Sequence, residues 1–161
     1  MQAKGLVRIG PIAVRKTILV EIVCALFVIL FIYTGLNKLL DYDTFKFQLG
    51  RSPYLQNFSR PVALLLPPGE LLVAIALIIK RTRLAGFYAS FFLMSLFTGY
   101  VTIMLSLSYY LPCSCGGILQ ALSWQGHLVF NSAFTFMAVA GTLLQYQLHP
   151  GSFAPRPRRN P

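Results

Sequence analysis

Four long runs of apolar residues divide this chain and limit what it can fold into. They run from Thr17 to Leu40, from Pro61 to Ile79, from Leu84 to Leu111 and from His127 to Leu148. A helix of about 20 apolar residues is long enough to cross the hydrocarbon core of a bilayer. Because backbone polar groups in lipid must be satisfied within their own segment, each run is expected to be a spanning helix. The sequence therefore predicts an all-α, polytopic membrane four-helix bundle.

Basic residues predict the orientation of this bundle. The chain carries 14 Lys and Arg against 4 Asp and Glu. Ten of the basic residues precede the first run, fill the gap between the second and third, or follow the fourth: Lys4, Arg8, Arg15, Lys16, Lys80, Arg81, Arg83, Arg156, Arg158 and Arg159. The positive-inside rule then predicts cytoplasmic termini in the inner membrane, N-in and C-in. Because these charges border apolar runs and do not alternate with aromatics, they do not indicate nucleic-acid binding.

The segments outside the runs predict a single membrane domain with short additions. Residues 1–16 contain Gly5, Gly10 and Pro11, which disfavour a long helix, and are expected to be a basic cytoplasmic tail. Residues 17–148 would form the membrane domain, and residues 149–161 a disordered cytoplasmic tail. On the outer face, residues 41–60 and 118–126 are expected to lie along the interface, partly as short helices.

An acidic residue inside the second run is the first candidate functional residue. Glu70 follows Pro67, Pro68 and Gly69, which are expected to interrupt the helix. A carboxylate at this depth is costly unless it is protonated, paired or beside water. We therefore interpret Glu70 as functional, with Lys38 as a supporting partner, while a purely structural cap or ion pair remains the alternative.

Two of the three cysteines lie one residue apart, at the end of the third run. Cys113 and Cys115 follow a proline and precede a glycine pair. Such a pair can be a reactive dithiol, a metal clamp or two small residues in a turn. A disulfide closed across one residue is strained, which favours exchange. Cys24 lies in the inner half of the first run and is expected to be a buried structural thiol.

Two polar residues open the fourth run near the same boundary. His127 and Asn131 are four residues apart and therefore share a helix face. A neighbouring imidazole would favour the reactive thiolate, so His127 is the candidate base for the dithiol. The alternative is an interfacial histidine bonded to a backbone carbonyl. Asn131 is a candidate supporting residue.

Three short motifs occur in a characteristic order. They are Gly35-Leu36-Asn37-Lys38-Leu39, Pro68-Gly69-Glu70-Leu71-Leu72 and Pro112-Cys113-Ser114-Cys115-Gly116-Gly117. In this order they resemble the DoxX-like membrane proteins, and specifically the MauE branch, over about residues 17–148. The resemblance implies a four-helix bundle that assists methylamine utilisation by helping to mature the disulfide-rich small subunit of methylamine dehydrogenase, alongside a thioredoxin-like partner. It also implies functional roles for Lys38, Glu70, Cys113 and Cys115.

The sequence as a whole predicts a membrane thiol-disulfide redox protein at the outer face. Its partners would be the lipid bilayer, a thioredoxin-like protein and exported thiol-containing clients. One alternative is a DoxX-type quinone-linked oxidoreductase subunit. Because Cys24 is deep and alone, a quinone is a possible cofactor there: held among the spans, it would carry the electrons, with Glu70 handling protons. The other alternative is a non-enzymatic chaperone or docking subunit, or one that binds a metal through Cys113, Cys115 and His127.

Overall fold

The computed structural model describes residues 11–52, 55–107 and 123–148, and its regular elements there are all helices. The long helices are α1 (Pro11–Leu40), α3 (Ser59–Ile78), α4 (Arg83–Leu107) and α5 (Trp124–Leu148). The short ones are α2 (Tyr42–Gly50) and the 3-10 helix η1 (Gln56–Phe58). All four long helices are long and apolar enough to cross a membrane. The predicted all-α fold with four spanning helices is confirmed.

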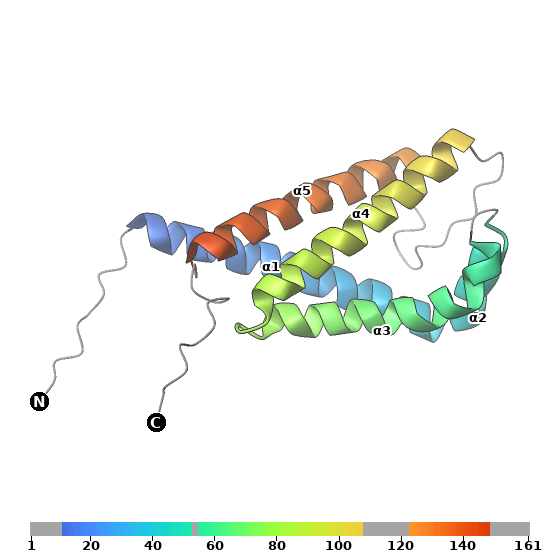
Figure 1. Cartoon of the computed structure of the whole chain (residues 1–161), viewed down its shortest axis with the longest axis horizontal. Helices are drawn as coiled ribbons and strands as arrows, with labels where there is room; N and C mark the ends of the chain where they lie inside the picture. The colour runs from blue at the N-terminus through green and yellow to red at the C-terminus, as the bar shows by residue number, and fades with distance from the viewer. Residues whose placement is uncertain (1–10, 53–54, 108–122, 149–161) are drawn as a thin grey trace, which may run out of the picture.

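The four long helices pack as a ring in which each contacts two neighbours. α1 packs against α3 and α5, and α4 packs against the same two helices (Figure 1). The end that carries Arg15, Lys16, Lys80, Arg81 and Arg83, here called the basic end, is opposite the end covered by α2. A hydrogen bond of 2.8 Å from Lys16 Nζ to Gln147 Oε1 joins the start of α1 to the end of α5 there.

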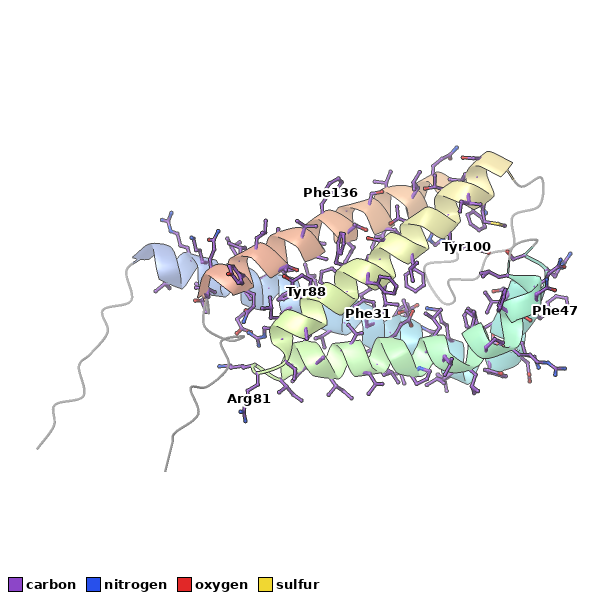
Figure 2. The ribbon with its side chains drawn as sticks, viewed as in Figure 1. Phe31, Phe47, Arg81, Tyr88, Tyr100 and Phe136 are labelled. Atoms are coloured by element: carbon purple, nitrogen blue, oxygen red, sulfur yellow. The ribbon has the colours of Figure 1, made fainter. Side chains whose placement is uncertain are left out.

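Aromatic rings fill the centre of the ring of helices. Phe27 of α1 is fully buried and lies 5.8 Å from Phe31, 6.5 Å from Phe87 of α4 and 5.3 Å from Phe134 of α5, measured between ring centroids. In contrast, Phe136 is 74% exposed and points away from the bundle (Figure 2). Many other large apolar side chains along the spans are exposed, among them Ile29, Leu72 and Phe92, as expected of a surface that faces lipid.

The expected interruption of the second span by its prolines is wrong. α3 continues as one helix through Pro67 and Pro68. A Cβ added at Gly35 of α1 would lie 3.2 Å from the Pro67 carbonyl oxygen and 3.2 Å from Leu71 Cδ2. Glycine at position 35 therefore allows α1 to approach α3 closely, at the turn where two backbone donors are missing. This packing supports the helix across the prolines.

The helices extend beyond two of the predicted boundaries. α1 begins at Pro11, so residues 11–16 of the expected cytoplasmic tail are helical. Proline is favoured in the first turn of a helix, because an N–H at that position would have no partner within the helix. Proline is unfavourable further into a helix. α5 begins at Trp124, so residues 124–126 of the expected interfacial segment are part of the fourth spanning helix. Residues 149–161 lie outside the described part of the chain.

The short helices expected between the first two spans are present and cover one end of the bundle. Phe45 and Leu49 of α2 are buried and pack with Ala63 of α3. Phe47 points away from the bundle (Figure 2), and the Arg51 guanidinium lies 5.4 Å from its ring centroid. Apolar contacts on one side and exposed polar residues on the other suit a helix at the membrane interface.

The orientation of the bundle is testable with two cysteine substitutions at exposed positions. In a variant that lacks the native cysteines, we expect Asp43→Cys in α2 to react with a membrane-impermeant maleimide in intact cells. Arg81→Cys, at the basic end, should react only after the cells are permeabilised, because basic residues are retained on the cytoplasmic side. The opposite pattern of labelling would invert the orientation.

Candidate functional site

A buried ion pair joins the first two spanning helices. Lys38 Nζ lies 2.5 Å from Glu70 Oε1. Glu70 is 0% exposed and Lys38 is 6% exposed. Side chains in a helix lean toward its N-terminus, which for Lys38 is the direction of Thr34, another residue of α1 that contacts Glu70. The pairing expected between these two residues is therefore present.

The second carboxylate oxygen has its own neighbour on α1. Thr34, one helical turn before Lys38, places its hydroxyl 3.1 Å from Glu70 Oε2. The same hydroxyl lies 3.0 Å from the Leu30 carbonyl oxygen, so its single proton can be given to one acceptor at a time. α1 thus supplies both polar contacts that stabilise the Glu70 carboxylate.

Aromatic rings surround the ammonium group. Lys38 Nζ lies 5.3 Å from the ring centroid of Phe97 on α4 and 5.8 Å from that of Phe45 on α2. A desolvated ammonium near an aromatic face gains about 2 kcal/mol or more from the ring quadrupole. Lys38 consequently connects α1, α2, α3 and α4 at one point.

A cavity of about 850 Å³ lies beside this pair, at the α2 end of the bundle. Its walls are mainly apolar and include Leu30, Phe31, Leu66, Leu93, Phe97 and Phe130. Lys38, Glu70, His127 and Asn131 supply polar groups to the same walls. This size, and the combination of apolar walls with a few polar groups, are typical of sites that bind small molecules.

The face shared by His127 and Asn131 is turned toward this cavity. His127 is 3% exposed and Asn131 is 7% exposed, and both line the cavity together with Trp124. The Trp124 and His127 rings lie 6.1 Å apart between centroids. The structure therefore brings four of the predicted residues, Lys38, Glu70, His127 and Asn131, around one space.

Sequence reasoning missed several residues at this site. Thr34 could have been found, because it lies four residues before Lys38 and so shares its helix face. Phe45 and Phe97 carry no such signal, since their roles depend on how α2 and α4 pack. A further polar contact, from the Tyr100 hydroxyl to Ser52 Oγ at 3.2 Å, links α4 to the end of α2 near the cavity.

The predicted thiol pair lies outside the described residues. Cys113 and Cys115 belong to residues 108–122, which connect α4 to α5 in the sequence. Trp124, at the start of α5, and Tyr100, in the second half of α4, both line the cavity. Within the described residues, no cluster of three or more His, Cys, Asp or Glu side chains is suited to hold a metal ion.

Cys24 occupies a different part of the bundle. It is a buried free thiol that donates a hydrogen bond of 3.3 Å to the Leu77 carbonyl oxygen. Arg83 Nε donates to the same carbonyl at 3.0 Å, and Arg83 Nη1 lies 2.6 Å from Glu21 Oε1. At about 1.5 Å per residue, Cys24 is about 20 Å along α1 from Lys38. Its contacts agree with the expected structural role.

Comparison with known proteins identifies the family. A family model described as methylamine utilisation protein MauE matches residues 16–144. The chain belongs to the MauE family. The match to MauE begins within α1 and ends within α5, so it includes Lys38, Glu70, Cys113, Cys115, His127 and Asn131. No curated protein and no solved structure matches the chain. The family match and the four apolar helices together make the chain a multi-pass membrane protein of the MauE type.

Proposed function

We propose that this MauE-family protein carries out thiol-disulfide exchange in the maturation of exported disulfide-containing proteins. One observation carries the proposal: the Cys113 and Cys115 pair lies, in sequence, between two helices that line a cavity with buried ionisable groups. The family's description links it to methylamine utilisation, so the small subunit of methylamine dehydrogenase is the expected client. A thioredoxin-like protein is the expected partner.

The chemistry begins with a thiolate. A thiolate of the partner attacks the disulfide between Cys113 and Cys115 and forms a mixed disulfide. A second thiolate of the partner then displaces the cysteine, so the partner gains a disulfide and the pair is left as two thiols. In this proposal, His127 is the base that favours the thiolate, with Asn131 beside it on the same helix face. Lys38 and Glu70 are the ionisable pair that holds protons beside the cavity.

The proposed location is the inner membrane, with the cysteine pair at its outer face. The support is the distribution of charge, because Arg15, Lys16, Lys80, Arg81 and Arg83 gather at the end opposite α2. Positive residues are retained in the cytoplasm. Both terminal segments, residues 1–10 and 149–161, then belong to the cytoplasmic side, and the membrane domain extends between them.

Serine variants test the exchange directly. We expect both Cys113→Ser and Cys115→Ser to abolish maturation of the client, because a single thiol cannot form the disulfide that the exchange consumes. The variant that keeps the cysteine to which the partner becomes linked should accumulate a mixed disulfide, which non-reducing gels and mass spectrometry would detect and identify. Cys24→Ser is the matched control and should behave as the native protein, because it removes a thiol that lies in the middle of α1 and bonds to the Leu77 carbonyl oxygen.

The same variants separate the alternative functions. A protein that binds a metal through the cysteine pair and His127 would lose the ion in both serine variants and trap no partner. Normal maturation in both variants would contradict the redox function and leave a docking or packing role. His127→Ala should slow exchange while the mixed disulfide still forms, because it removes a base and not a thiol.

A further inference from the structure

We propose that the cavity beside Lys38 and Glu70 binds an isoprenoid quinone, whose ring carbonyls accept hydrogen bonds from Asn131 and Lys38. Binding itself depends only on residues that the structure describes. The role of the quinone as the electron acceptor for Cys113 and Cys115 rests on the proposed function.

Asn131 supplies the first polar contact. Asn131 is 7% exposed and lines the cavity. The Asn131 backbone carbonyl accepts a hydrogen bond of 2.8 Å from Thr135 Oγ1, but the part of the chain that is described contains no hydrogen-bond partner for the side-chain amide. Because this amide faces an apolar cavity, a ligand that accepts a hydrogen bond from it would be stabilised there.

Lys38 supplies the second contact from another wall. An ammonium group has three N–H donors, and within the described residues Glu70 Oε1 is the hydrogen-bond acceptor for one of them. The rings of Phe45 and Phe97 lie near the group but accept only weakly. Donors from α1 and α5 therefore line the same apolar space. A ligand that uses both donors must be largely apolar and carry at least two hydrogen-bond acceptors.

The walls exclude most other ligands. Phe97 and Phe130 are only partly buried and offer aromatic surface for a flat ring, and the volume of about 850 Å³ leaves room for part of an apolar tail. The acyl chain of a phospholipid has no acceptor that could reach either donor, and its ionic headgroup would be desolvated by these walls. A quinone combines a flat ring, two opposed carbonyl oxygens and a tail soluble in the bilayer.

A quinone also completes the balance of the exchange reaction. When a dithiol becomes a disulfide, two S–H bonds break, one S–S bond forms, and two electrons and two protons are released. A quinone that takes up the two electrons and the two protons becomes a quinol, so no other reactant is needed. Among the described residues Cys24 is a lone thiol at the opposite end of the bundle, and it offers no competing route for two electrons.

Trp124 makes the binding measurable. It is the single tryptophan of the chain and it lines the cavity. Quinones quench indole fluorescence at short range. The purified full chain in detergent would be titrated with a short-chain isoprenoid benzoquinone, and saturable quenching is the expected result. The double variant with serine at positions 113 and 115 should bind equally, because the thiols are not part of the site.

Asn131→Leu should weaken this binding by about tenfold, the order expected for one buried hydrogen bond. The matched control is Gln145→Leu, which changes another buried amide of α5 that does not line the cavity and should leave binding unchanged. Gly99→Leu is a second, independent test of the site, which still applies if Asn131→Leu fails to fold. A Cβ at Gly99 meets no atom within 4 Å, so the leucine can enter the cavity and should also weaken binding.

Three outcomes would overturn the proposal: quenching that does not saturate, quenching that is unchanged in both Asn131→Leu and Gly99→Leu, or displacement of the quinone by phospholipid at equal concentration. If the serine variants trap no partner but the quinone still binds, the proposed thiol exchange is contradicted and the quinone site stands. If a partner is trapped but no quinone binds, the quinone site is contradicted and the proposed thiol exchange stands.

Discussion

Replacing Lys38 by methionine should destabilise the protein by about 3 to 5 kcal/mol, because it leaves the Glu70 carboxylate buried without its counter-charge. Methionine has nearly the same length, so the change mainly removes the charge. The measurement is the free energy of unfolding of purified protein in mixed micelles, followed by Trp124 fluorescence. Lys46→Met is the matched control. Lys46 lies on α2, where its ammonium is 6.0 Å from the Tyr42 ring, and it lacks a buried carboxylate partner among the described residues.

A double variant identifies the cause of the loss. Lys38→Met combined with Glu70→Leu removes both charges and should recover most of the lost stability, since an apolar pair of similar volume often replaces a buried ion pair well. Glu70→Gln alone should cost less than Lys38→Met, because the remaining ammonium keeps its two aromatic neighbours, and it is therefore the variant for measuring activity. If Lys38→Met is as stable as the native protein, the ion pair has no structural importance.

Replacing Phe27 by alanine should cost about 3 kcal/mol or more. Phe27 is fully buried among Phe31, Phe87 and Phe134 of three helices. In a bilayer the denatured helices still lie in an apolar medium, so the loss comes mainly from the cavity and the missing ring contacts, and less from transfer out of water. The same unfolding measurement applies. Phe136→Ala, on the lipid-facing side of α5, is the matched control and should change stability little.

The fold could be predicted from the sequence because few backbone structures are stable in lipid. Four apolar runs had to be helices, and the positions of Lys80 to Arg83 indicated where the second and third spans turn. The position of the prolines was misleading for a physical reason. Whether Pro67 and Pro68 break a helix depends on what packs against that turn, and Gly35 is far away in sequence although it is adjacent in space.

The candidate site was accessible only in part. Glu70 and Lys38 were found because charge in an apolar run is rare and costly, and the spacing of His127 and Asn131 placed them on one face. Their meeting around one cavity depends on how α5 packs against α1 and α4, which no local pattern encodes. Phe97 looks like any other apolar residue of a span until the structure places its ring near an ammonium group.

The ion pair between α1 and α3 also bears on how the protein is made. A lone charged side chain at the centre of a spanning helix raises the free energy of membrane insertion by about 2.5 to 3.5 kcal/mol, and Glu70 lies near the centre of α3. Since Lys38 and Glu70 neutralise one another, α1 and α3 enter lipid at lower cost together than one after the other. The connection through α2 and η1 spans only residues 41–58, so α3 follows α1 closely during synthesis. The first two spans would thus leave the translocon as a preassembled hairpin, onto which α4 and α5 are added later in synthesis.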